Sequence, residues 1–298
     1  MNSIGVVTVT FNSAHVLKDF LDSMAKQTHT NYILYVIDNA SDDDTAKIIS
    51  EVDDARIVYI QNDKNLGVAA GNNQGIVKAI EDGCESILLL NNDTLFETTL
   101  FEKMARTLEI HQADIIVPKM YYFDKKNILW FAGGEFDNIF QCDVSHAGFR
   151  EEDNGQYDRI QTITYAPTCC MLITKQTIED VGLMDEKYFV YEDDVDFCYR
   201  ATHIMKKKMI YFPDVTFYHK VGGLTNKEGS SFKSDFAIRM MTRNKVYRCK
   251  KYFSFSKAVY LLLMLFRENL KIILQRHYKR SYKSFILMNL SFIKGMFY

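Results

Sequence analysis

Short hydrophobic runs alternate with longer amphipathic stretches over the first 120 residues. The runs are rich in β-branched residues and fit buried strands, which we predict at Ile4–Thr10, Tyr32–Asp38, Arg56–Gln61, Ile87–Leu90 and Ile115–Pro118. The stretches between them fit helices near His15–Lys26, Asp42–Glu51, Gly67–Ile80 and Thr98–His111. Ser41 is the candidate N-cap of the second helix. This alternation predicts an α/β fold with a mostly parallel sheet and right-handed crossovers.

The pattern changes in the second half of the chain. Residues 119–161 are rich in glycine and aromatic side chains and fit an inserted hairpin, and residues 162–218 return to strand, helix and an acidic loop. Phe232–Cys249 and Phe255–Tyr298 fit helices. We therefore predict a main domain over residues 1–250 and a basic, amphipathic helical tail over residues 251–298.

Charge is distributed unevenly along the chain. Of its 36 Lys/Arg, 13 lie from Arg243 onward beside a single acid, Glu268, although the whole chain has a net charge of −2. The longest apolar run of the tail, Ala258–Phe266, has nine residues, whereas a membrane-spanning helix needs roughly 20. The tail is thus expected either to dock on an anionic membrane surface or to pack on the body. No nucleic-acid-binding motif accompanies the charge, so no nucleic acid partner is expected.

The six cysteines and the N-terminal sequence bear on the cellular compartment in which the protein is expected. The cysteines have no Cys-x-x-Cys or Cys/His ligand spacing, which is typical of buried thiols in a reducing environment. The chain enters its first strand at once, with no basic segment or cleavage site of an export signal. Both observations favour a cytoplasmic protein.

Polar side chains end several of the predicted strands. Ile87–Leu90 is followed by Asn91, Asn92 and Asp93, and ligands of open α/β sheets bind beyond the carboxyl ends of the strands. Asp93 suits a hard cation, with the two asparagines as neutral partners. Asp38 ends the second strand on the same edge and suits a ribose or base, although the bland alternative for residues 38–42 is a helix-capping turn.

Three further segments carry candidate chemistry. The stretch from Asn65 to Gly75 places small residues at a helix start, where a backbone can approach a phosphate or another element closely. It has neither a G-x-G-x-x-G pattern nor a Walker lysine. The acidic run 192–196 and then His219 suggest a general base and a metal ligand. The bland reading of that run is a solvated acidic loop, which the aromatic residues around it disfavour.

Taken in order, these segments resemble the family-2 glycosyltransferases of the GT-A fold, and are most similar to bacterial rhamnosyltransferases and galactofuranosyltransferases. The resemblance covers roughly residues 4–250. It is carried by Thr8-Val9-Thr10-Phe11-Asn12, Asp38-Asn39-Ala40-Ser41, Asn65-Leu66-Gly67, Asn91-Asn92-Asp93, Gly182-Leu183-Met184-Asp185-Glu186, Asp193-Asp194-Val195-Asp196-Phe197-Cys198-Tyr199-Arg200 and His219.

The resemblance implies a role for each matched residue. Asp93 would be the second acid of the D-x-D motif and would bind Mg²⁺ or Mn²⁺ with His219, while Asn91 stands in place of the first acid. Thr10 and Asp38 would hold the nucleoside of the donor, and Asn65 would lie near its diphosphate. Asn12, Asn91, Asn92 and Asp93 would also bind the donor.

Asp194 would be the catalytic base of an inverting single displacement. Asp193 and Asp196 would raise its proton affinity by like-charge repulsion. Asp196 and Arg200, spaced i, i+4, are expected to pair on the following helix.

The resemblance also implies a donor, an acceptor and a location. The donor would be dTDP-rhamnose or a UDP-sugar, and the acceptor a saccharide, commonly linked to a lipid, in cell-surface polysaccharide synthesis. A peripheral position at the inner face of the cell membrane would follow. The segment Ala166-Pro167-Thr168-Cys169-Cys170 replaces a glycine-containing turn of the family, which leaves the sugar open. The oligomeric state is open too.

Two alternatives compete with transfer of a sugar. A sugar nucleotidyltransferase would carry a glycine-rich signature and a basic residue soon after the first strand, and Gly5–Asn12 has neither. A non-catalytic protein that binds sugar nucleotides would tolerate loss of Asp93 or Asp194, and both are present.

Overall fold

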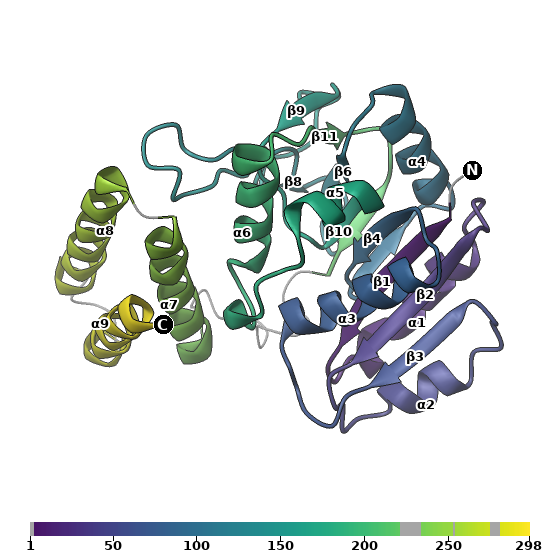
Figure 1. The fold of residues 1–298 in the computed structure, drawn as a ribbon, viewed down its shortest axis with the longest axis horizontal. Helices are drawn as coiled ribbons and strands as arrows, with labels where there is room; N and C mark the ends of the chain where they lie inside the picture. The colour runs from purple at the N-terminus through teal and green to yellow at the C-terminus, as the bar shows by residue number, and fades with distance from the viewer. Residues whose placement is uncertain (1–2, 221–233, 253, 275–280) are drawn as a thin grey trace. The chain divides into compact units, whose positions relative to one another are not determined.

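The computed structural model describes residues 3–220, 234–252, 254–274 and 281–298. The chain forms two compact units (Figure 1). The first comprises Met1–Glu135, Ser145–Phe189 and Asp193–Leu224. The second comprises Phe136–Val144, Val190–Glu192 and Thr225–Tyr298.

An eight-stranded sheet forms the centre of the first unit, in the order β3-β2-β1-β4-β10-β6-β11-β9. Its strands are β1 Ile4–Thr10, β2 Tyr32–Asp38, β3 Ile57–Gln61, β4 Ser86–Leu90, β6 Ile115–Pro118, β9 Gln161–Ile163, β10 Cys170–Thr174 and β11 Met209–Phe212. The four strands from β3 to β4 are parallel, as predicted, whereas β10 runs antiparallel to β4 and β6. The strand bounds are close to those predicted because each apolar run ends in polar residues.

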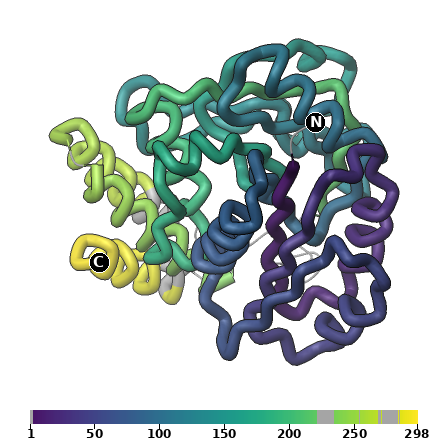
Figure 2. Tube along the Cα trace, turned by 45° about the vertical axis from the view of Figure 1, so that its right-hand side comes forward, coloured from purple at the N-terminus to yellow at the C-terminus, as the bar shows by residue number. Residues whose placement is uncertain are grey.

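Helices connect and cover these strands. They are α1 Ala14–Ala25, α2 Thr45–Ser50, α3 Val68–Glu81, α4 Leu100–Ile110, α5 Lys175–Val181 and α6 Asp193–Tyr199. Helix α3 lies against β1 (Figures 1 and 2), and a Cβ atom at Gly75 would come within 2.3 Å of the Val7 side chain. The small residues of this helix therefore allow close packing on the sheet.

The predicted cap of α2 is wrong. The helix begins at Thr45, with Asp44 in the N-cap position. The Ser41 hydroxyl instead donates a 2.5 Å hydrogen bond to Asp38 Oδ1 and accepts the backbone N–H of Asn12 at 2.8 Å. A helix start needs an acceptor for its free N–H groups, but this hydroxyl already accepts the Asn12 N–H and donates to a carboxylate. Ser41 therefore stays with the strand tip.

A second, four-stranded sheet has the order β5-β12-β7-β8. Its strands are β5 Thr94–Phe96, β7 Met120–Tyr122, β8 Leu129–Phe131 and β12 Phe217–His219. Strands β7 and β8 are antiparallel neighbours and confirm the hairpin predicted in residues 119–161. Strand β12 pairs with β5, which follows β4 directly.

The second unit is built on the helices α7 Asp235–Lys251, α8 Phe255–Leu274 and α9 Ser281–Phe297. Helix α9 packs closely on α7, since a Cβ atom at Gly295 would lie 2.6 Å from the Arg243 carbonyl oxygen. A small core joins Cys142, Val246, Cys249, Tyr260 and Leu261. The predicted boundary at residue 250 falls inside α7 and stays a prediction. Among the described residues, no helix combines the length and the apolar character that a membrane crossing requires.

Candidate active site

Two predicted metal ligands lie side by side because of strand pairing. Asp93 stands between β4 and β5, and His219 ends β12, where it pairs with Thr94. His219 Nε2 lies 3.2 Å from Asp93 Oδ1. Both residues are buried, with 7% of Asp93 and 8% of His219 exposed. The small sheet therefore brings together two side chains that are 126 positions apart in the sequence.

Several polar atoms at this point are buried without a hydrogen bond. Within the part of the chain that the structure describes, they include Asp93 Oδ1, Asn92 Oδ1 and His219 Nδ1. The Asn92 amide itself donates a 2.7 Å bond to the Val9 carbonyl, which fixes its position. Buried polar atoms without partners are costly and call for an explanation. Carboxylate, amide and imidazole donors suit a divalent cation.

The residues described here supply only part of a coordination shell. No group of three or more His, Cys, Asp or Glu side chains suitable for a metal occurs among them. A carboxylate and an imidazole bound at right angles to one ion at about 2.1 Å would lie about 3 Å apart. The observed separation of 3.2 Å fits such a pair.

The predicted base lies at the start of α6. Asp194 Oδ2 accepts a 3.1 Å hydrogen bond from the Tyr165 hydroxyl, and Oδ1 accepts the Val195 N–H at 2.8 Å. Its side chain is only half-buried, whereas Asp193 is buried. Asp194 is thus held in one orientation while its side chain stays partly exposed.

The predicted pair of Asp196 and Arg200 is confirmed, with Arg200 Nε 2.9 Å from Asp196 Oδ2. Asp196 is fully buried and also accepts a 2.9 Å bond from the Tyr188 hydroxyl. Arg200 further donates to the carbonyls of Val181 and Leu183. The Arg200 guanidinium neutralises the charge of Asp196. This pairing weakens the repulsion that we expected Asp196 to exert on Asp194.

Aromatic rings connect the two halves of the site. The Trp130 ring meets His219 edge to face at 4.6 Å between centroids. His146 lies 5.9 Å from Trp130 and 5.4 Å from Tyr165, whose hydroxyl binds Asp194. Burial lowers the pKa of His146, so the ring favours its neutral form. A chain of contacts thus runs from Asp93 and His219 through these rings to Asp194.

Sequence reasoning did not single out Trp130, His146 or Tyr165. One available signal was that Trp130 is the only tryptophan of the chain, and another was the adjacent pair Gly133-Gly134. A Cβ atom at Gly134 would lie 2.7 Å from the Tyr165 carbonyl oxygen and 2.9 Å from its ring. The glycine is therefore required for the close approach that places Tyr165 on Asp194.

Cys169 lies near the predicted metal ligand Asp93 and the predicted base Asp194. Burial is the main cause that raises the pKa of its thiol well above the usual range, and the charges of Cys170, Asp93 and Asp194 add to it. The exposed Asn91 is tied to the same residue, since its N–H donates to the Cys169 carbonyl at 2.9 Å. The thiol stays protonated and serves packing.

The residues predicted to hold the nucleoside form a compact network. Asp38 is 0% exposed and accepts the Thr10 hydroxyl at 2.9 Å and the Tyr59 hydroxyl at 2.8 Å. Burial, with the bond to Asp38, raises the pKa of Tyr59. Asn12 accepts the Asp42 N–H at 2.9 Å. Thr10 thus binds Asp38 directly, and Asn12 binds the turn that follows Asp38. Contact of these residues with a donor stays a prediction.

Asn65 forms a turn just before α3, whose N-cap is Gly67. Its Oδ1 accepts the Gly67 N–H at 2.9 Å, and Gly67 has a φ of 88°. Its predicted position near a diphosphate is untested by these contacts.

Comparison with known proteins decides the family. Residues 5–182 match glycosyl transferase family 2, which is more than half of the chain. The chain belongs to this family. The glycosyltransferase fold and the enzyme class expected from the sequence are thereby confirmed, and the nucleotidyltransferase alternative finds no support.

Curated relatives of this glycosyltransferase are distant. It is 24% identical over 205 residues to the low-salt glycan biosynthesis hexosyltransferase Agl10 of Haloferax volcanii, covering 67% of this chain and 62% of that protein. It is 24% identical over 226 residues to the dTDP-rhamnosyl transferase RfbF of Shigella flexneri, covering 74% of this chain and 71% of the relative.

Solved structures share the fold of the glycosyltransferase. The S. aureus protein TarS superimposes with a TM-score of 0.62 at 16% identity, over 99% of this chain and 48% of TarS. A shorter TarS structure in complex with UDP-GlcNAc gives a TM-score of 0.60 at 16% identity, over 99% of this chain and 79% of that one. The glycosyltransferase thus spans about half of full TarS and 62% of the Haloferax relative.

Proposed function

We propose that the protein transfers a sugar from a nucleotide diphosphate donor to a hydroxyl of a saccharide acceptor, with inversion at the anomeric carbon. The observation that carries the proposal is the cluster in which Asp93 and His219 connect through aromatic rings to Asp194. It supplies a cation-binding pair and a half-exposed carboxylate, the two elements that such a displacement requires.

The metal would be Mg²⁺ or Mn²⁺, held by Asp93 and His219. The orphaned buried atoms of this position fit such an ion, and the neutral Asn91 and Asn92 add no charge to it. When bound, the ion offsets the negative charge that builds on the departing diphosphate. Because the described residues provide only two strong ligands, diphosphate oxygens and water would complete the shell.

Asp194 would remove the proton of the acceptor hydroxyl as that oxygen attacks. Tyr165 donates to one carboxylate oxygen and keeps the side chain oriented, and hydrogen bonds to a carboxylate favour its charged form. A single attack opposite the leaving group inverts the sugar. Asp193, Asp196 and Arg200 would support this segment without touching substrate.

The donor is proposed to be dTDP-rhamnose, with a UDP-hexose second. The likeness to RfbF, whose name gives dTDP-rhamnosyl transfer, supports the first choice. TarS structures in complex with UDP and with UDP-GlcNAc support the second. Thr10, Asn12 and Asp38 would receive the nucleoside, and Asn65 the diphosphate side.

A panel of nucleotide sugars tests this assignment. Thermal stabilisation and hydrolysis of each donor, with Mn²⁺ and then with EDTA, should single out one nucleotide and one sugar. Absence of any metal-dependent stabilisation by dTDP- or UDP-sugars would reject the proposed donor class. Retention of the anomeric configuration in the product would reject the single displacement.

The acceptor is proposed to be linked to a membrane lipid, with the second unit docking on the anionic cytoplasmic surface. Exposed apolar side chains lie along two helices of this unit: Leu262, Leu263, Phe266 and Leu270 on α8, and Leu290, Ile293 and Phe297 on α9. Basic residues accompany them, among them Lys250, Lys251, Arg267, Lys283 and Lys294. Each basic residue near such a surface contributes about 1 kcal/mol.

Liposome flotation tests this docking. The double substitution of Leu262 and Phe266 by serine should release the protein from anionic vesicles, because it removes the apolar contact without removing charge. Ile110→Ser is the matched control, since Ile110 is 64% exposed on α4 of the first unit. Equal flotation of all three proteins would exclude α8 as the docking helix.

A further inference from the structure

The backbone just before the predicted base is strained. Phe189, Tyr191 and Glu192 have φ values of 63°, 65° and 66°. Such left-handed conformations are uncommon for residues other than glycine, and three among four consecutive residues persist only where the surroundings hold them. The segment continues directly into α6, which begins with Asp193 and Asp194.

Helix α7 holds this segment through a buried amide. Asn244 is 0% exposed, and its Nδ2 donates 2.9 Å hydrogen bonds to the carbonyls of both Val190 and Tyr191. Arg243 Nε donates to Asn244 Oδ1 at 2.8 Å. Because the oxygen already faces a donor, the amide nitrogen must face the two carbonyls. The contact is specific for an asparagine amide.

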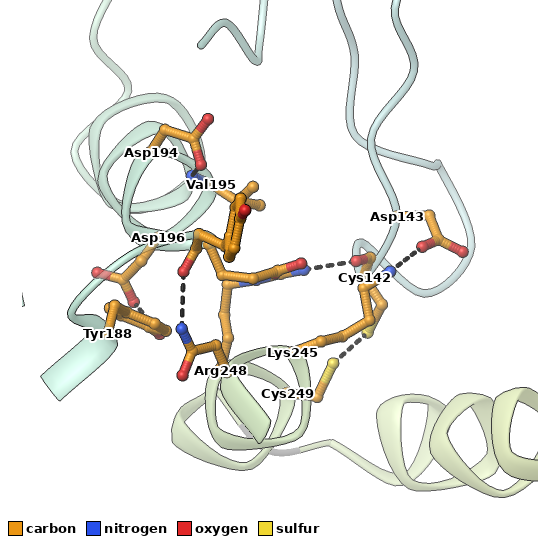
Figure 3. Close-up of polar contacts among 12 residues, drawn as sticks. Cys142, Asp143, Tyr188, Asp194, Val195, Asp196, Lys245, Arg248 and Cys249 are labelled. Carbon is orange, nitrogen blue, oxygen red and sulfur yellow. Dashed lines mark hydrogen bonds and ion pairs between the residues drawn. The ribbon is translucent and has the colours of Figure 1, made fainter. Parts of the chain in front are cut away.

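One turn further along α7, Arg248 holds the last residue of the segment. It is 2% exposed, and its Nε lies 2.8 Å from Glu192 Oε2. Another of its nitrogens donates a 2.6 Å bond to the Cys142 carbonyl (Figure 3). A buried ion pair is kept in one geometry when further hydrogen bonds satisfy its remaining donors. Glu192 therefore cannot rotate away without leaving a buried charge alone.

Helix α9 supports α7 at the level of these residues. Gly295 packs against the Arg243 carbonyl, and the Arg243 guanidinium lies 4.4 Å above the Tyr298 ring. The last residues of the chain thus brace the turn of α7 that carries Arg243 and Asn244.

We propose that Asn244 and Arg248 are positioning residues: they hold the segment Val190–Glu192 in its strained conformation, and turnover by Asp194, two residues further along the chain, depends on that conformation. The inference rests on the proposed role of Asp194 as the base.

The test compares Asn244→Ala with Asn289→Ala in the full-length protein. Asn289 is an asparagine of α9 whose amide donates to the Phe285 carbonyl of its own helix, so its loss leaves the segment untouched. Asn244→Ala should lower kcat by at least about tenfold, since small displacements of catalytic groups have large effects on rate. Its affinity for nucleotide with Mn²⁺ should stay within about twofold of the parent, because those ligands lie elsewhere. Asn289→Ala should match the parent in both measurements.

Amide hydrogen exchange separates this inference from the proposed function. In Asn244→Ala the amides of residues 190–196 should exchange faster, while those of β1, β2 and β4 stay protected. Unchanged exchange in residues 190–196 would overturn the positioning role, whatever the activity. Faster exchange in a protein whose parent transfers no sugar would uphold the positioning role and reject the proposed function.

Arg248→Lys serves if Asn244→Ala fails to fold. Lysine keeps the charge opposite Glu192 and cannot reach Glu192 and the Cys142 carbonyl together, because it lacks the planar fork of arginine. It should show the same pattern of lower kcat, unchanged nucleotide affinity and faster exchange in residues 190–196. Parent-like kcat and exchange in Arg248→Lys would contradict the inference.

Discussion

Replacing the base without replacing its shape gives the most direct test of the mechanism. Asp194→Asn keeps the shape of the side chain. Its single oxygen can accept the Val195 N–H, as Oδ1 does at 2.8 Å, and its amide nitrogen can donate to the Tyr165 hydroxyl, which binds Oδ2 at 3.1 Å in the parent. The fold should therefore be nearly unaffected, with a change in the free energy of unfolding below about 1 kcal/mol. An amide cannot take a proton from the acceptor, so turnover should fall by about 10²- to 10⁴-fold.

That loss corresponds to about 2.7–5.5 kcal/mol of transition-state stabilisation. The assay is transfer from the preferred donor, measured with saturating donor and acceptor, beside calorimetric titration with nucleotide and Mn²⁺. Nucleotide affinity should be unchanged because the proposed role of Asp194 is toward the acceptor and not the donor. Turnover of the variant within about tenfold of the parent, at equal nucleotide affinity, would refute the assignment of the base.

Asp196→Asn is the matched control on the same helix. Asp196 is fully buried and pairs with Arg200, so loss of its charge breaks a buried ion pair, which costs about 3 kcal/mol or more. For a protein of this size, the melting temperature should fall by about 6 °C or more. The two substitutions should therefore have opposite profiles, one lowering turnover and the other lowering stability.

Three further predictions concern the rest of the cluster. Asp93→Ala should abolish metal-dependent nucleotide binding, and an unchanged titration with nucleotide and Mn²⁺ would reject its role. Trp130, 4.6 Å from His219, should sensitise Tb³⁺ luminescence on excitation near 295 nm, and His219→Ala should remove this signal; equal luminescence in both proteins would place the ion elsewhere. Burial lowers the pKa of His146 from its ordinary 6.5, so wild-type stability should fall as the pH drops through 6.5 and below. His146→Phe should flatten that decline in urea unfolding between pH 7.5 and 5, and parallel curves for the two proteins would contradict it.

The sequence predicted the features that depend on local pattern. Strands β1, β2 and β6 were predicted with their observed bounds, because uninterrupted apolar runs mark buried parallel strands. The pair of Asp196 and Arg200 followed from helical spacing alone. The resemblance implied that Asp93 and His219 share a metal, and the pairing of β5 with β12, which the sequence did not predict, brings the two side chains together.

Features that depend on long-range packing escaped prediction. Ser41 is a residue type that often caps helices, yet its hydroxyl donates to the Asp38 carboxylate instead. Trp130 and Tyr165 reach the site through the hairpin β7–β8 and a glycine contact, and neither has a periodic signature. The bonds from Asn244 to Val190 and Tyr191 cross more than fifty positions. No pattern in a single sequence encodes such a pairing.

The proposed metal ligands and the proposed base are held in place by different structural features. Asp93 and His219 are fixed by the register of two paired strands, a rigid arrangement that many hydrogen bonds share. Asp194 follows a strained segment whose conformation depends on a few side chains of α7. Loss of these side chains should therefore lower turnover before it lowers donor binding, because the strained segment relaxes more easily than a sheet slips in register. Substitutions in α7 should therefore lower kcat and leave nucleotide affinity unchanged, whereas substitutions in β12 should lower nucleotide affinity.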